Sequence, residues 1–206
     1  MSDTRAFVSA IVAGLAVTGL SVYLYVQGTT GAVAAEDGPG PNLVIEVGGA
    51  TSGTIVIDLL PDVAPRHVAQ ITELARTGAY DDVVFHRVID GFMAQTGDVE
   101  HGKFGGDLEL AGTGKSGLPN IPAEFSDLPF QRGIVGMARS SSPDSANSQF
   151  FIMFALADHL NGQYTVVGHV IEGMDVVDTI KKGGFDQNGA VTDPDRMVSV
   201  TVEEQQ

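Results

Sequence analysis

Hydrophobic and polar residues alternate cleanly near the end of the chain, in the stretch MVSVTVE at residues 197–203. Successive side chains of a β-strand point to opposite faces, so this period of two predicts a strand that buries one face. NLVIEV at residues 42–47 and TIVIDLL at residues 54–60 are also strand-like. They are separated by GGATSG, whose composition predicts a turn.

The hydrophobic period changes after residue 60. Apolar residues now recur three or four positions apart, which predicts an amphipathic helix, at Val68, Ile71, Leu74 and Ala75. Pro65 suits the first turn of this helix, and Gly78 suits its end. A second, shorter helix is expected at residues 174–182, where two lysines in the last turn would complement the helix dipole.

Five further apolar stretches predict short strands, at residues 83–89, 91–98, 133–139, 149–155 and 164–171. A long polar and glycine-rich stretch at residues 99–120 predicts a loop. Strands and helices do not alternate as they do in parallel α/β proteins, and no internal repeat is visible. The pattern therefore predicts a mainly β protein whose single domain is an antiparallel barrel or sandwich.

The N-terminal part of the chain has a different character. Residues 6–26 carry no charged side chain and match the roughly 20 residues that a transmembrane helix needs. Small residues at 32–35 resemble a signal-peptide cleavage site, near Ala34 and Ala35. A membrane anchor is slightly favoured over a cleaved signal, and a buried core helix is the third alternative.

Either of the first two alternatives predicts export to the periplasmic side of the inner membrane, anchored or released after cleavage. Arg5 before the segment and two acidic residues after it agree with this orientation. The expected organisation is an export segment at residues 1–35, a linker at residues 36–41 and a folded domain at residues 42–206.

Charge and composition exclude several classes of function. The chain has 11 basic and 26 acidic residues and a formal net charge of −15, which argues against a nucleic-acid partner. The absence of cysteine excludes disulfides, thiolate catalysis and cysteine metal sites.

The five histidines lack metal-ligand spacing, and the group Asp98, Glu100 and His101 is typical of an incidental acidic loop. AGTGKSG is not a phosphate-binding loop, because Glu109 stands where that motif requires glycine.

An arginine stands inside an apolar run in the stretch FHRVIDGFMAQTGD at residues 85–98. Residue types alone favour a structural explanation for Arg87, in which its stem packs and its head pairs with an acid such as Asp98 or Glu124. The alternative is that the charged group serves chemistry. If so, the chemistry uses no nucleophile, because no carboxylate pair or Ser-His-Asp set is recognisable.

Three blocks of sequence resemble the cyclophilin family of peptidyl-prolyl cis-trans isomerases. They are FHRVIDGFMAQTGD, then GIVGMAR, then SQFFIMFALADHLNGQYTVVGHVIEGMDVV, and the resemblance extends over about residues 42–203. It implies a closed antiparallel barrel of eight strands capped by two short helices. It also implies acceleration of X-Pro bond isomerisation without any metal, nucleotide or other cofactor.

The same resemblance implies roles for individual residues. Arg87 would donate a hydrogen bond to the proline nitrogen in the twisted transition state, and Gln95 would orient Arg87 and contact the substrate backbone. The proline ring would lie in an apolar pocket formed by Phe92, Met93, Phe151 and Leu160. Ala138 and Gln149 would line the neighbouring groove, and the backbone of Arg139 would pair with the residue before proline. Strand alternation places Phe92 and Gln95 on opposite faces, so a bulge or twist is expected between them.

Three positions depart from the best-known eukaryotic pattern of the family. His159 stands where tryptophan is often found, Tyr164 replaces a histidine, and Arg139 replaces an asparagine. The ring of Tyr164 would still cover the proline pocket. Loss of the tryptophan N–H argues against tight binding of cyclosporin but not against turnover.

The sequence therefore predicts a monomeric, exported prolyl isomerase that assists the folding of exported proteins. Its partners would be proline-containing polypeptides, with membrane contact only through the N-terminal segment. A binding module that holds proline-containing segments is the main rival hypothesis, although such a module would have no need of Arg87. A membrane-tethered acidic structural domain is a third hypothesis, and it leaves the pocket residues unexplained.

Overall fold

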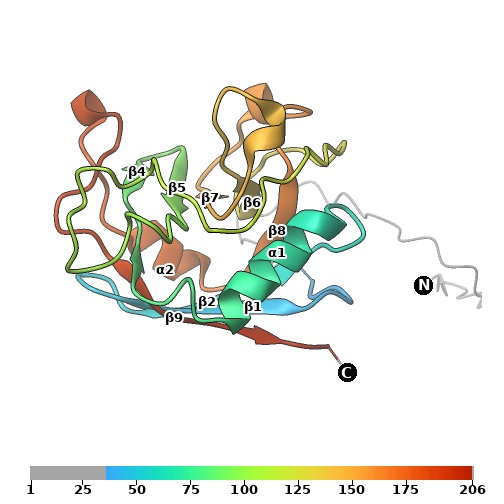
Figure 1. The fold of residues 1–206 in the computed structure, drawn as a ribbon, viewed down its shortest axis with the longest axis horizontal. Helices are drawn as coiled ribbons and strands as arrows, with labels where there is room; N and C mark the ends of the chain where they lie inside the picture. The colour runs from blue at the N-terminus through green and yellow to red at the C-terminus, as the bar shows by residue number, and fades with distance from the viewer. Residues whose placement is uncertain (1–35, 206) are drawn as a thin grey trace, which may run out of the picture. The chain divides into compact units, whose positions relative to one another are not determined.

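A computed structural model describes residues 36–205 of the chain. Figure 1 shows the strands and helices, and the order of the elements is β1 (Asn42–Gly48), β2 (Gly53–Leu59), α1 (Pro65–Arg76), β3 (Val83–Val84), β4 (Arg87–Ile89), β5 (Met93–Thr96), β6 (Ile134–Met137), β7 (Phe150–Met153), β8 (Val166–Glu172), α2 (Met174–Thr179) and β9 (Arg196–Glu203). Short 3-10 turns lie at Pro143–Ser145, Asp158–Leu160 and Phe185–Gln187.

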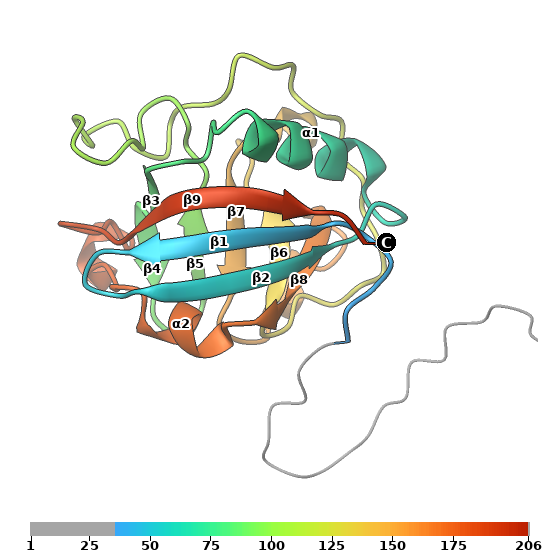
Figure 2. The same cartoon turned by 90° about the horizontal axis from the view of Figure 1, so that it is seen from below.

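The described strands form one antiparallel sheet of nine strands in the order β3-β9-β1-β2-β8-β6-β7-β5-β4. Figure 2 shows that β9, β1 and β2 cross in front of β5, β7 and β6, with α1 and α2 on opposite sides of the strands. The two edge strands, β3 and β4, are separated in the chain only by Phe85 and His86. No ladder joins β3 to β4 in the described part of the chain. The two residues between these strands instead close the curled sheet into a barrel.

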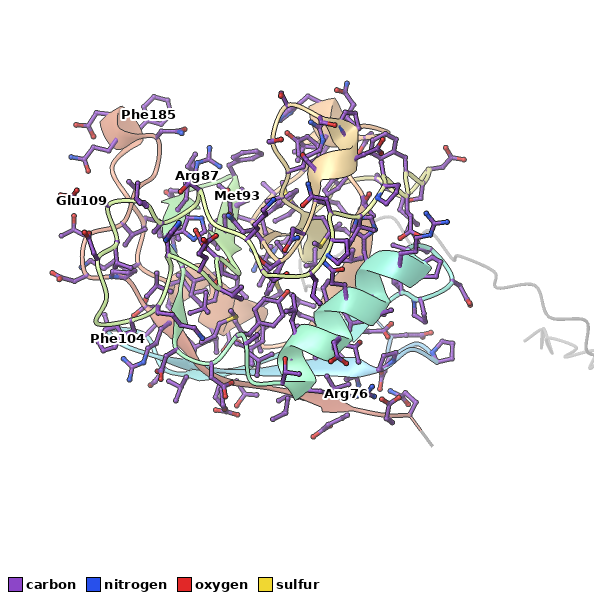
Figure 3. The ribbon with its side chains drawn as sticks, in the orientation of Figure 1. Arg76, Arg87, Met93, Phe104, Glu109 and Phe185 are labelled. Carbon is purple, nitrogen blue, oxygen red and sulfur yellow. The ribbon has the colours of Figure 1, made fainter. Side chains whose placement is uncertain are left out.

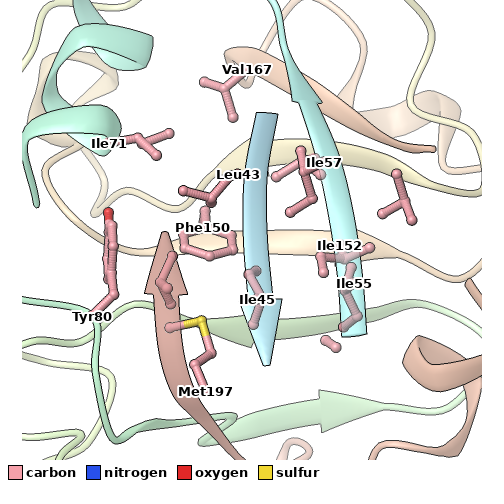
Figure 4. Packing of buried hydrophobic residues seen from close by; sticks show 14 of the residues in the cluster. Leu43, Ile45, Ile55, Ile57, Ile71, Tyr80, Phe150, Ile152, Val167 and Met197 are labelled. Atoms are coloured by element: carbon pink, nitrogen blue, oxygen red, sulfur yellow. The ribbon is translucent and has the colours of Figure 1, made fainter. Parts of the chain in front are cut away.

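The interior of the barrel holds the main hydrophobic core. Ile45 of β1 lies opposite Ile55 of β2, and Leu43 lies opposite Ile57, with all four side chains buried. Figure 4 shows these side chains together with Phe150 and Ile152 of β7, which belongs to the opposite layer. Burial of this continuous apolar surface, rather than local propensity, stabilises strands as short as these.

The antiparallel barrel with two helices is confirmed, although it has nine strands instead of eight. The difference arises at residues 83–89, which were expected to be one strand. Val83 and Val84 pair with β9, whereas Arg87 and the following two residues pair with β5. The chain crosses from one layer to the other between them, so a single strand cannot continue.

Helix positions agree with the sequence patterns, with one difference in length. Pro65 lies in the first turn of α1, and Gly78 adopts φ +69° just after its end. The second helix is shorter than expected, because Ile180 leaves the helical region (ψ 132°) and is fully buried. The two lysines therefore follow α2 and do not lie in its last turn.

The expected export segment at residues 1–35 lies outside the described residues. No helix within residues 36–205 is long and apolar enough to cross a bilayer. The segment expected to be a linker begins the described part and contacts the barrel, where the backbone N–H of Gly38 donates to the carboxylate of Asp58 over 3.0 Å.

Candidate active site

Strand alternation gives the layer formed by β6, β7 and β5 two different faces. Ala94 of β5 and Ile152 of β7 join the main core. The residues next to them, Met93 and Phe151, belong to a second cluster of buried side chains on the other face. Gln95 lies opposite Phe151 in the β5–β7 register, so its side chain is on this second face as well. Residues that the motif places together in sequence are thus sorted by the strands into core and site.

The second face carries a hollow of about 410 Å³, which we call the main hollow. Its lining contains ten of the predicted site residues and, in addition, Gln163, and the full set is Arg87, Phe92, Met93, Gln95, Ala138, Arg139, Phe151, His159, Leu160, Gln163 and Tyr164. Figure 3 shows Arg87 and Met93 on neighbouring strands at one edge of the molecule. Gln149 instead lines an adjoining hollow of about 370 Å³ that shares Gln95, Ala138 and Arg139 with the first.

Phe92 reaches the main hollow from a turn. The β4–β5 hairpin turns at Gly91, which has φ +69°, and β5 begins only at Met93. Strand alternation therefore does not apply to Phe92, and its ring lies 5.7 Å from the ring of His159. The β4–β5 and β5–β7 ladders run without a register shift, so a bulge is not what brings Phe92 to the hollow; its place in the turn is.

Aromatic rings form the floor of the main hollow. The ring of Phe151 stacks on Phe130 at 5.8 Å and meets the edge of Tyr164 at 5.9 Å. Gly136 makes room for this stack, since a Cβ atom there would lie 2.5 Å from Phe130 and 2.6 Å from Phe151. Buried aromatic pairs in such offset and edge-on arrangements give a rigid apolar surface.

One wall of the hollow includes two of the three positions that depart from the family pattern. The guanidinium of Arg139 lies 4.4 Å from the ring centre of Tyr164 and donates to the carbonyl of Gln163 over 3.0 and 3.2 Å. The stacked cation and the two hydrogen bonds join the end of β6 to the segment before β8. Sequence reasoning missed Gln163, because its backbone carbonyl, which no residue pattern marks, makes the contact.

Arg87 projects into the main hollow with only neutral partners among the described residues. Its Nη1 donates to Gln95 Oε1 over 3.3 Å and lies 3.8 Å from the sulfur of Met93. Its Nε donates to the carbonyl of Asn188 over 2.9 Å, and its Nη2 donates to Asn188 Oδ1 over 3.1 Å. Partial burial lowers the pKa of Arg87, whereas Tyr164 acts in the opposite direction. A guanidinium nevertheless stays charged in proteins.

The ion pair that residue types favoured for Arg87 is wrong, because both candidate acids are engaged elsewhere. Asp98 accepts hydrogen bonds from four backbone N–H groups, those of Glu100, His101, Gly112 and Gly114. Glu124 accepts from the backbone N–H groups of Arg66 and His67 at the start of α1 and from the ring of His67. The charge of Arg87 is therefore not neutralised by a carboxylate in the described part of the chain.

A directed chain of hydrogen bonds supports Gln95. The amide nitrogen of Gln95 donates to Gln149 Oε1 over 2.9 Å. The amide nitrogen of Gln149 in turn donates to the carbonyls of Gly112 and Gly114, over 3.1 and 2.8 Å. Asp98 holds the backbone N–H groups of these same two glycines. The loop thus orients Gln149, which orients Gln95 with its oxygen toward Arg87.

Within residues 36–205, no three His, Asp or Glu side chains lie close enough together to hold a metal ion. What the main hollow offers is an apolar, aromatic surface with a charged five-donor group at its edge. Such an arrangement can bind a small apolar ring and hydrogen-bond an acceptor next to it.

The family model for cyclophilin type peptidyl-prolyl cis-trans isomerases matches residues 43–202. A probable peptidyl-prolyl cis-trans isomerase of Brucella suis is 60% identical over 153 residues, which cover 73% of this chain and 78% of that protein. A peptidyl-prolyl cis-trans isomerase of Arabidopsis thaliana is 37% identical over 136 residues, which cover 63% of this chain and 78% of that protein.

Solved structures agree with this assignment. A cyclophilin from Hirschia baltica has a TM-score of 0.64 and 26% identity, covering 80% of this chain and 74% of its own. A cyclophilin type isomerase from Cryptosporidium parvum, crystallised in the presence of the dipeptide Ala-Pro, shares the fold with a TM-score of 0.67 at 23% identity, covering 80% of this chain and 99% of its own. The chain therefore belongs to the cyclophilin family, and it is a peptidyl-prolyl cis-trans isomerase acting on proline-containing peptides.

Proposed function

We propose that Arg87 catalyses the isomerisation by donating a hydrogen bond to the proline nitrogen as the X-Pro bond twists. The single observation that carries the proposal is the position of the Arg87 guanidinium at the edge of the main hollow, where its partners within residues 36–205 are all neutral. No covalent intermediate and no proton transfer are needed.

The chemistry of the amide explains why such a donor accelerates rotation. Rotation about the C–N bond must cross a barrier of about 20 kcal/mol, because the bond is partly double. In the planar amide the nitrogen lone pair is delocalised and accepts hydrogen bonds poorly. In the twisted transition state the lone pair is localised on nitrogen, so a donor placed there binds the transition state more tightly than either ground state.

The magnitude of this effect bounds what Arg87 contributes. A hydrogen bond to a charged group is worth about 1.5–3 kcal/mol net. That energy corresponds to about a 10- to 150-fold acceleration. The rest of the acceleration is assigned to the preorganised site, in which dipoles and donors are already aimed at the reacting bond.

The surrounding residues are assigned to substrate positioning. The proline ring fits the apolar surface of Phe92, Met93, Phe151 and Leu160, with Tyr164 and His159 at its rim. Gln95 orients Arg87 and contacts the substrate backbone. Ala138, Gln149 and the backbone of Arg139 line the path of the residues before proline. These assignments are supported by the lining of the main hollow and the adjoining hollow.

Replacement of Arg87 by lysine tests the donor geometry. Lysine keeps the charge but loses the planar fork that contacts Gln95 and Asn188 together. We expect Arg87→Lys to retain only a minor part of kcat/KM on an Ala-Pro peptide, with a folded protein by circular dichroism. A fully active lysine variant would show that charge alone is sufficient and that the fork is not required.

We further propose that residues 6–26 carry the isomerase domain out of the cytoplasm, where it assists the folding of exported proteins. The support is the uncharged apolar segment and the residues that flank it. Protease added to intact spheroplasts should degrade the domain, and N-terminal sequencing should separate an anchor from cleavage near Ala34 and Ala35. Protection of the domain until the cells are lysed would contradict export.

A further inference from the structure

The segment between α2 and β9 lies directly against the strand that carries Arg87. The backbone N–H of Val88 donates to the carbonyl of Gly189 over 2.8 Å, and the N–H of Gly183 donates to the carbonyl of Val88 over 2.9 Å. A Cβ atom at Gly189 would lie 2.4 Å from a side-chain carbon of Ile89, so only glycine permits this approach. Gly183 and Gly189, near the two ends of this turn, are therefore both hydrogen-bonded to the backbone of Val88.

This packing brings Asn188 to the guanidinium of Arg87. Asn188 adopts φ 54° and ψ 30°, a left-handed conformation that asparagine tolerates better than most residues. Both its backbone carbonyl and its side-chain oxygen accept hydrogen bonds from Arg87, over 2.9 and 3.1 Å. Figure 3 shows the neighbouring Phe185 beyond Arg87, where this turn projects from the molecule.

The five N–H groups of Arg87 are only partly used by its neighbours. Asn188 takes the Nε hydrogen and one Nη2 hydrogen, and Gln95 takes one Nη1 hydrogen. One hydrogen on each of Nη1 and Nη2 remains, and among the residues that the structure describes Nη1 has one further acceptor, the weakly accepting sulfur of Met93. Asn188 and Gln95 thus hold the fork from two sides and leave its remaining donors for a substrate atom.

We propose that Asn188 is a positioning residue that fixes the guanidinium plane of Arg87 in its productive orientation. This inference rests on the proposed role of Arg87 as the donor. A planar fork held at two sites loses little freedom when it binds the transition state, so the positioning should appear in kcat more than in KM. Asn188 contacts no reacting atom and acts only through Arg87.

The test compares Asn188→Gly with Asn188→Asp in the full-length chain. Glycine keeps the left-handed backbone and its carbonyl and removes only the side-chain acceptor, whereas aspartate keeps an oxygen acceptor. We expect Asn188→Gly to lower kcat by about two- to tenfold with KM and the thermal midpoint nearly unchanged. Asn188→Asp keeps an oxygen acceptor, but its carboxylate would pair with the guanidinium, so we expect it to hold the fork in place and yet to lower kcat. NMR of the Arg87 guanidinium should show faster rotation about its Nε–Cζ bond in the glycine variant.

Two controls separate this inference from the role of Arg87 itself. Gln187→Ala, in the same exposed turn, should match the wild type, because that side chain makes no hydrogen bond in the described structure. Adding Asn188→Gly to Arg87→Ala should cause no further loss. Wild-type kcat in Asn188→Gly, or rotation about the Nε–Cζ bond of Arg87 as slow in Asn188→Gly as in the wild type, would overturn the inference, while a loss in Arg87→Ala preserved the proposed function. Full activity of Arg87→Ala would instead overturn the proposed function.

Discussion

Gln95 donates its amide hydrogen to the side-chain oxygen of Gln149 over 2.9 Å, and this contact fixes the direction of both amides. Gln149 has its nitrogen facing the carbonyls of Gly112 and Gly114, so only its oxygen is left for Gln95. Gln95 must then present its own oxygen to Arg87. The loop thus helps to orient Arg87, the proposed donor, through two glutamine side chains.

Variants of Gln149 test this chain of hydrogen bonds. Gln149→Met removes the acceptor for Gln95, and we expect a loss of about threefold in kcat/KM, in line with one neutral hydrogen bond. Gln149→Glu keeps an acceptor but turns a carboxylate toward two carbonyl oxygens, so we expect a larger loss, of about tenfold, at neutral pH. Peptide isomerisation rates measure both. Wild-type rates in both variants would show that Gln95 needs no support.

Gly136 should be essential to the aromatic floor of the hollow. Gly136→Ala places a methyl group within 2.6 Å of both Phe130 and Phe151, two buried rings that have little room to move. We expect a loss of about 1–3 kcal/mol in the free energy of unfolding, the usual cost of overpacking, together with a higher KM. Denaturant titration and peptide kinetics measure the two effects.

The matched control is Gly117→Ala, because nothing lies within 4 Å of a Cβ atom at that position. This variant should leave both stability and KM close to those of the wild type. Equal stability of the two variants would contradict the claim that the floor is tightly packed around Gly136.

Asp98 should make stability depend on pH in the acid range. Burial alone would raise the pKa of Asp98, but four backbone N–H donors outweigh burial and lower the pKa below its ordinary value of 3.8. A depressed pKa means that the unfolded state binds the proton more readily than the folded state. The stabilisation is therefore complete above the ordinary pKa and is lost as the pH falls through the lower, folded-state pKa.

We expect Asp98→Asn to lower the free energy of unfolding by about 1–3 kcal/mol at neutral pH. The difference from the wild type should begin to shrink near the ordinary pKa, where the unfolded chain takes up the proton. It should vanish only when the pH falls below the lower, folded-state pKa. Denaturant titrations over this pH range measure the effect, with the exposed Asp62→Asn as control. A difference that stays constant down to the lowest pH would show that the carboxylate charge is not what holds the loop.

Much of the architecture could be predicted from local patterns, because a strand or helix that buries one face shows a regular spacing of apolar residues. The alternation at residues 197–203 and the helical spacing that ends before Gly78 correspond to β9 and α1. The division of residues 83–89 into two strands was missed, because it depends on pairing with β9 and β5 rather than on local composition.

The residues that line the main hollow could be predicted where one motif contains them, whereas residues brought there by distant contacts were missed. Residues 85–98 supplied Arg87, Met93 and Gln95 together, because β4 and β5 form a hairpin. Asn188 lies 101 positions from Arg87 in an unremarkable polar turn, so no local signal marked it. The expected acid partners of Arg87 were wrong because composition does not reveal that Asp98 and Glu124 are already satisfied by backbone N–H groups.

The most direct test of the account is the isomerisation rate of an Ala-Pro peptide with the wild-type chain and with Arg87→Ala. Because Arg87 forms no ion pair in the described structure, its removal should shift the thermal midpoint by only a few degrees. We predict a loss of about 10- to 150-fold in kcat/KM from a folded variant. A folded Arg87→Ala protein with wild-type kcat/KM would contradict the central claim that Arg87 stabilises the twisted amide.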